Sequence, residues 1–281
     1  MTLNQPAVTT DIEEDATVPV IGIGASAGGL EALRDMFAAA GTSPGMCFVV
    51  VQHLDPNHES MMAQLIDRHT ELIVKQCEGG EKVEADTVYI IPPGHGLAIM
   101  DGHLTLTDFE QPRGLRRPID DFFISLALDQ TTNAACVILS GTGADGTTGL
   151  RAIKEHGGIS VVQEPGTAKY DGMPLSAVGT GLVDFVAAPA EIVGRLQSFF
   201  NRHKVDKHDQ AEVVADHVDE LCRVLRTAVG HDFSGYKRST LVRRVERRMH
   251  VLGIAKGRDY LDRTRTDRAE CEALFRDLLI N

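Results

Sequence analysis

The amino-acid sequence predicts an α/β fold: a doubly wound, mostly parallel sheet with a β-hairpin, followed by a small all-α domain. Short apolar runs of strand length alternate with segments whose apolar residues recur at helical spacing. The strand-like runs end in glycine or in other small or polar residues, which is typical of strand-to-helix turns. With 281 residues, 43% of them hydrophobic, the chain is long enough for an α/β domain of about 150–200 residues and a smaller unit.

The expected elements follow one another in a regular order. The first strand is predicted in the apolar run 18–23, and the helix after it in the segment that begins at Leu30. Residues 97–100 and 103–107, joined by Asp101-Gly102, predict a β-hairpin with a two-residue turn. Further strands are expected at 46–51, 72–74, 87–91, 134–139, 159–163 and 183–186. Further helices are expected at 58–69, 118–128 and 147–156, after the loop 170–174, and at 189–200 and 209–229.

Composition divides the chain into three parts. Residues 1–17 are polar and acidic, lack the features of a signal peptide, and are expected to be a disordered tail. The α/β domain is assigned to 18–203 and the helical domain to 204–281, because the charge changes near residue 204. Residues 1–204 contain 13 Lys and Arg and 26 Asp and Glu, whereas residues 205–281 contain 15 Lys and Arg and 14 Asp and Glu. The acidic larger part argues against nucleic-acid binding.

Cysteine, histidine and hydropathy patterns exclude several other classes of protein. The five cysteines include no C-x-x-C pair, which favours reduced thiols and a cytoplasmic location. No apolar run approaches the roughly 20 residues of a membrane span, so no membrane insertion is expected. The histidines show no metal-ligand spacing such as H-x-x-x-H. Neither a metal nor a cofactor is expected.

The turn after the first strand allows three interpretations. Gly22-x-Gly24-x-x-Ala27 fits the relaxed dinucleotide fingerprint, whose glycines let the backbone approach a pyrophosphate. Gly24-x-Ser26-x-Gly28 fits the nucleophile elbow of serine hydrolases, which exposes a serine on a tight turn. The third interpretation is a close strand-to-helix turn that uses glycine for packing alone.

Three polar residues favour the hydrolase interpretation. Ser26, His53 and Asp145 each follow a predicted strand, and the carboxyl ends of parallel strands form the usual site of such sheets. The second strand ends in Gln52-His53 rather than in the acidic residue that a dinucleotide fold needs. The chain order of the three residues and the early serine disfavour the α/β-hydrolase fold, although a triad is recognised by geometry and not by order.

The three residues suit a nucleophile, a base and an orienting acid. His53 would take the proton of Ser26, and Asp145 would fix the histidine tautomer. Backbone N–H groups of the Ser26 turn or of the loop 141–146 would hold the developing oxyanion. Taken singly, His53 could be a hydrogen-bonded core histidine and Asp145 a cap of the helix after it. Their coincidence at three strand ends favours a site.

Four ordered motifs resemble the chemotaxis protein-glutamate methylesterases, the CheB family. They are Ile23-Gly24-Ala25-Ser26-Ala27-Gly28-Gly29, Gln52-His53, the segment 139–146 and Gly172-Met173-Pro174. The resemblance covers roughly residues 16–203. It implies hydrolysis of glutamyl methyl esters on chemoreceptors, often with deamidation of glutamines, and a triad of Ser26, His53 and Asp145.

The resemblance also implies residues around the oxyanion and the substrate. They are Ala27, Thr142, Gly143 and Met173. Many members of the family have threonine at the position of Ala27 and methionine at that of Thr142. These two departures leave the triad unchanged and bear on the oxyanion site or on specificity.

Residues 204–281 resemble the N-terminal helical domain of chemotaxis receptor methyltransferases, the CheR family. The resemblance rests on the segments 231–252 and 275–281, and the family's S-adenosylmethionine-binding domain would follow residue 281. No methyl transfer is therefore expected. Between residues 236 and 268, 11 Lys and Arg stand against 4 Asp and Glu. This run is either a solvated face or a docking surface for an acidic partner.

Two functions follow from these observations. The first is a serine hydrolase that acts on glutamyl methyl esters, with a methyl-accepting chemoreceptor or related sensory protein as partner. The alternative is a catalytically weak sensory scaffold that binds receptor or kinase partners through the basic helices.

Overall fold

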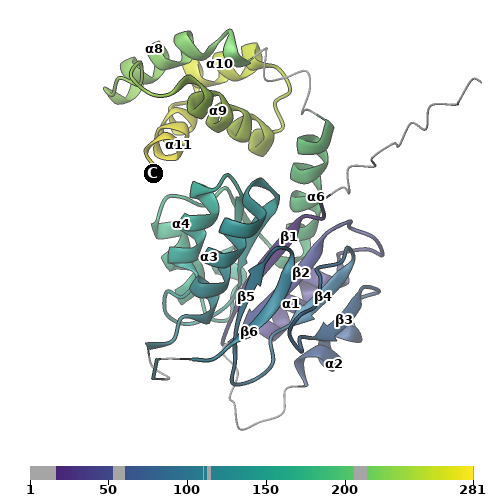
Figure 1. Cartoon of the computed structure of the whole chain (residues 1–281). Helices are drawn as coiled ribbons and strands as arrows, with labels where there is room; N and C mark the ends of the chain where they lie inside the picture. The colour runs from purple at the N-terminus through teal and green to yellow at the C-terminus, as the bar shows by residue number, and fades with distance from the viewer. Residues whose placement is uncertain (1–16, 53–60, 110, 113–114, 206–213, 281) are drawn as a thin grey trace, which may run out of the picture.

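A computed structural model of the protein describes residues 17–52, 61–109, 111–112, 115–205 and 214–280. The described residues between 17 and 205 form a three-layer α/β unit, and residues 214–280 form a helical unit beside one end of it (Figure 1). In the parts of the chain that are described, no helix combines the length and apolar character needed to cross a membrane.

The α/β unit is built on one fully parallel sheet. Its strands are β1 (Val20–Ala25), β2 (Cys47–Gln52), β3 (Ile73–Gln76), β4 (Thr87–Ile90), β7 (Ala134–Ile138), β8 (Ile159–Gln163) and β9 (Phe185–Ala187). They lie in the order β3-β4-β2-β1-β7-β8-β9. The strands β2, β3 and β4 lie on one side of β1. The chain then crosses to the other side of β1, where β7, β8 and β9 lie. The strand order therefore reverses at β1, which is where ligands bind in open α/β sheets.

Helices cover both faces of this sheet. The helices α1 (Gly29–Ala38), α2 (Met62–Asp67) and α6 (Pro189–Val205) share one apolar core with it. On the other face lie α3 (Pro118–Gln130), α4 (Thr147–Glu155), α5 (Gly172–Gly179) and the hairpin of β5 (Gly96–Met100) and β6 (His103–Thr107). The hairpin turn has positive φ at both Asp101 and Gly102, as a two-residue type I′ turn requires. The predicted fold class is confirmed.

Several element boundaries differ from the sequence prediction; for example, β1 begins two residues later than expected and α6 extends to Val205. The last strand begins at Phe185 instead of 183, and the side chain of Asp184, just before it, lies in a buried ion cluster. The helix expected after the loop 170–174 begins inside it, at Gly172. The helix expected over 209–229 is interrupted by a turn at 216–217, and residues 209–213 lie outside the described residues. Residues 58–60 of the helix expected at 58–69 also lie outside them.

The helical unit has an apolar core of its own. It contains α8 (Val218–Val229), α9 (Arg238–Leu252), α10 (Gly257–Thr266) and α11 (Arg268–Leu279). Gly230, at φ 76°, ends α8 as expected. Asp267 caps α11 by accepting hydrogen bonds from the amides of Ala269 and Glu270. The core side chains include Leu221, Leu225, Phe233, Val245, Met249, Tyr260 and Leu274.

Candidate active site

Ser26 lies on a tight turn between β1 and α1. It directly follows the last residue of β1, and its carbonyl accepts a hydrogen bond of 2.9 Å from the Gly29 amide. Gly28 has φ 73°, a left-handed conformation that favours glycine. The Ser26 amide donates to the Ser140 carbonyl at 3.0 Å. Ser26 is half-buried, so the turn presents a serine at the carboxyl end of the central strand.

The two glycines inside β1 serve helix packing. A Cβ on Gly24 would lie 2.5 Å from Cγ2 of Ile119, and a Cβ on Gly22 would lie 2.9 Å from Phe123. Both contacts are to α3, which lies directly on β1. The packing interpretation of the glycine pattern therefore accounts for Gly22 and Gly24.

A buried serine that the sequence did not single out joins the loops of the site. The Ser140 hydroxyl donates to the Ala27 carbonyl at 2.9 Å and accepts from the Tyr170 amide at 3.0 Å. The Ser140 amide donates to Oε1 of Gln163 at 2.8 Å. Ser140 and Gln163 are almost fully buried. Together they hold the Ser26 turn, the loop after β7 and the loop before α5 in one arrangement.

Asp145 follows β7, the other neighbour of β1, and its carboxylate is held by main-chain amides. One oxygen accepts from the Ile119 amide at 3.2 Å, and the other accepts from Asp120 at 3.0 Å and Gly146 at 2.9 Å. Asp145 thereby binds the first turn of α3, which is a different role from capping the helix after it. The three donors fix the orientation of a carboxylate that is only 6% exposed.

A second carboxylate, Asp120, completes this arrangement. It lies in the first turn of α3, and its Oδ1 accepts from the Gly149 amide in the first turn of α4 at 2.8 Å. Its Oδ2 is buried and has no hydrogen-bond partner among the described residues. Burial and the nearby Asp145 carboxylate raise the pKa of Asp120 to about 6. Asp145, from the loop after β7, thus caps α3, and Asp120, from α3, caps α4.

The third predicted site residue, His53, lies outside the described residues. The residue before it, Gln52, pairs with Ala25, the residue before Ser26, in the register of β2 and β1. Gln52 also donates from its side-chain nitrogen to the Ser26 carbonyl at 3.4 Å. The described part of the site is therefore the Ser26 turn, the Asp145 loop and the end of β2.

The residues expected around the oxyanion divide into two groups. Ala27, Thr142 and Gly143 are exposed, and within the described residues no hydrogen bond is made by the amides of Ala27 and Thr142. Met173 is fully buried, and its amide donates to the Gly141 carbonyl at 2.9 Å. That Met173 contacts the oxyanion or the substrate stays a prediction. Its sulfur packs against Gly141, on which a Cβ would lie 2.1 Å from that sulfur and 2.9 Å from the Cβ of Ser26.

The basic run of the helical unit is not one solvated face. Arg244, Arg247 and Arg248 are buried. Many exposed arginines of this unit form ion pairs with acidic neighbours on the same unit, namely Arg226, Arg238, Arg258, Arg263, Arg265 and Arg268. The three buried arginines of the run are therefore not exposed to an acidic partner outside the chain in this arrangement.

Comparison with known proteins assigns both units. Residues 21–196 match the CheB methylesterase family, and residues 216–279 match the all-alpha domain of the CheR methyltransferases. The catalytic domain of the CheB methylesterase of Thermotoga maritima has a similar structure, with a TM-score of 0.59 and 31% identity. The match covers 64% of this chain and 98% of that domain.

Curated relatives extend the similarity. A protein-glutamate methylesterase/protein-glutamine glutaminase of Thiobacillus denitrificans is 34% identical over 189 residues, which are 66% of this chain and 52% of that protein. An uncharacterized 104.1 kDa protein of Rhodobacter capsulatus is 33% identical over 243 residues, which are 78% of this chain. The chain spans 25% of the length of the Rhodobacter protein and about half that of the Thiobacillus one.

Proposed function

Since the chain belongs to the CheB methylesterase family, we propose that it hydrolyses methyl esters of glutamyl side chains on a chemoreceptor or related sensory protein. The observation that carries the proposal is the position of Ser26 and Asp145. They follow the adjacent strands β1 and β7, at the reversal of strand order, on loops held together by buried hydrogen bonds. The relatives named protein-glutamine glutaminase extend the proposal to deamidation of glutamines.

The chemistry runs through an acyl-enzyme. Ser26 Oγ attacks the ester carbonyl while His53 takes its proton, and the N–H groups of Ala27 and Thr142 receive the developing oxyanion. His53 then returns the proton to the departing methoxide, so methanol leaves and an ester on Ser26 remains. Water then attacks that ester while His53 takes its proton, and His53 returns the proton to Ser26 Oγ as the acyl–Oγ bond breaks, which releases the glutamic acid that ionises to the carboxylate. Asp145 holds the histidine in the required tautomer.

The location proposed for this reaction is the cytoplasm. All five cysteines are free thiols, and four of them are buried. Such thiols are typical of a reducing compartment.

Methanol release from a methylated receptor fragment tests the proposed function. Ser26→Ala should lower the rate about 1,000-fold or more, because the remaining groups have no nucleophile to activate. Ser43→Ala is the matched control, since the Ser43 hydroxyl is exposed and contacts Asp86, away from the site. Equal rates for the wild type and Ser26→Ala would refute the assignment of the nucleophile. An inactive wild type would favour the scaffold alternative.

A further inference from the structure

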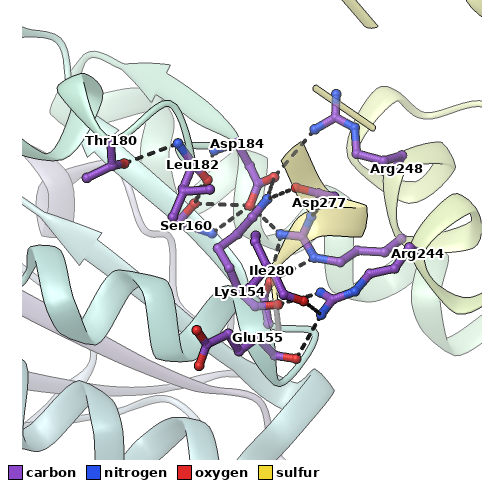
Figure 2. A network of polar contacts seen from close by, with 12 residues as sticks. Lys154, Glu155, Ser160, Thr180, Leu182, Asp184, Arg244, Arg248, Asp277 and Ile280 are labelled. Atoms are coloured by element: carbon purple, nitrogen blue, oxygen red, sulfur yellow. Dashed lines mark hydrogen bonds and ion pairs between the residues drawn. The ribbon is translucent and has the colours of Figure 1, made fainter. Parts of the chain in front are cut away.

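A cluster of buried charges lies where the α/β unit meets the helical unit (Figure 2). Lys154 on α4 and Asp184 before β9 come from the α/β unit. Their partners come from α9 and α11, and they are Arg247, Arg248, Glu270 and Asp277. No side chain of the six is more than 8% exposed. Three cations therefore face three anions in the interior of the molecule.

Asp184 is the centre of the cluster on the α/β side. One of its oxygens accepts from Lys154 Nζ at 2.6 Å, and the other accepts from the amide and hydroxyl of Ser160 at 3.0 and 3.1 Å. Arg247 of the helical unit donates to the same carboxylate. Although burial opposes the charge, the Arg247 and Lys154 cations hold the pKa of Asp184 below its usual range. The carboxylate is thus shared between the two units.

The helical unit closes the cluster with two acids from α11. Asp277 accepts from Arg247 at 2.7 Å and lies 2.9 Å from Lys154 Nζ. Glu270 receives the Arg248 guanidinium on both oxygens and the Tyr260 hydroxyl at 2.7 Å. Paired, hydrogen-bonded geometry of this kind is what a buried ion pair needs to offset its desolvation.

Two of the buried arginines also bind main-chain carbonyls of the α/β unit. Arg244 donates to the carbonyls of Lys154 at 2.7 Å and Glu155 at 3.1 Å, in the last turn of α4. Arg247 donates from Nε to the Gly158 carbonyl at 3.0 Å. The last carbonyls of a helix lack partners within it and carry partial negative charge, so a cation placed there is stabilised. The helical unit therefore binds the C-terminal end of α4 specifically.

We propose that the end of α4 together with Asp184 is a docking surface whose partner is the chain's own helical unit. This surface of carbonyl and carboxylate oxygens is complementary to a helix that carries several arginines on one face. The helix α9 presents such a face, and two acids from α11 support it. The Rhodobacter relative supports this choice, because its alignment covers 78% of this chain, more than either unit alone. In the docked state Arg244, Arg247 and Arg248 are withheld from any acidic partner outside the chain.

Hydrogen exchange of the full chain, followed by mass spectrometry, tests the docking. The reporters are the amides of residues 156–160, because the Ser160 amide donates to Asp184 and the amides of 156–158 close the end of α4. Arg247→Gln should speed their exchange about tenfold or more while β1 and β2 keep their protection. Arg243→Gln is the matched control, since Arg243 lies on the same helix and is exposed.

The outcomes separate clearly. Unchanged exchange at 156–160 in Arg247→Gln would overturn the proposal, as would two separate calorimetric unfolding transitions in the wild type. A single transition in the wild type that splits in Arg247→Gln supports it. If Arg247→Gln does not fold, Arg244→Gln is read in the same way, because it removes the bonds to α4 and leaves the six-charge balance intact. None of these measurements depends on the proposed hydrolase activity.

Discussion

Replacing Asp120 by asparagine should remove a pH dependence from the stability of the protein. The residue is 3% exposed, and burial together with the Asp145 carboxylate raises the pKa of its side chain from 3.8 to about 6. The folded state therefore binds this proton more tightly than the unfolded state. The free energy of unfolding should fall as the pH rises from about 4 to about 6, and this contribution should be constant above that range.

The magnitude follows from the size of the pKa shift. A difference of roughly two pKa units between folded and unfolded states corresponds to about 3 kcal/mol. Asparagine keeps the size of the side chain and an oxygen that can accept from the Gly149 amide, so its main effect is to remove the titration. The difference in unfolding free energy between wild type and Asp120→Asn should thus change by up to about 3 kcal/mol across this range, in favour of the variant at higher pH.

Urea unfolding at a series of pH values from about 4 to about 8 measures this difference. Other titrating groups are common to both proteins and largely cancel in the comparison. Asp35→Asn is the control for the loss of one carboxylate, because Asp35 is exposed and lies on α1. A difference between the wild type and Asp120→Asn that does not change with pH would refute the reasoning.

Two further predictions follow from packing and burial. Gly24→Ala should destabilise the protein by about 1–3 kcal/mol and lower hydrolysis, because its Cβ would displace Ile119, whose amide binds Asp145. Gly194→Ala, in open space on α6, should be neutral or stabilising, and equal effects of the two variants would contradict the packing argument. A thiol reagent should label Cys222 first in the native protein, and early labelling of the wild type that persists in Cys222→Ser would contradict this. Burial raises the pKa of all five thiols, Cys222 included, so the greater exposure of Cys222 carries this prediction.

Local patterns of apolar residues are enough to predict most of the fold. Runs such as 46–51 are apolar throughout because parallel strands are covered on both faces, and the structure places β2 there. The strand ends then placed Ser26 and Asp145 at one edge of the sheet. Asp145 was identified by this argument, yet its actual contacts are with α3, which begins 27 residues earlier in the chain. No periodicity can report a contact between a loop and a helix that lie so far apart in the chain.

The residues that the sequence did not single out act through tertiary contacts. Ser140, Gln163 and Asp120 are polar side chains that would ordinarily be assigned to the surface. Each is buried and is hydrogen-bonded to a main-chain amide or carbonyl that lies far away in the chain. The arginines of α9 are a stronger case, since their spacing predicts a charged face but not what it binds. A single sequence does not reveal that the acidic partner lies within the same chain.

The helix α4 lies between the candidate active site and the helical unit and contacts both. Its N-terminal turn follows Asp145 and donates the Gly149 amide to Asp120, and its C-terminal carbonyls accept from Arg244. A helix of nine residues is stiff over its length of about 13 Å. Both of its ends are therefore held by side chains from other elements, one set in the candidate active site and the other in the helical unit. Docking of the helical unit and the orientation of the Asp145 loop are constraints on the same rigid element.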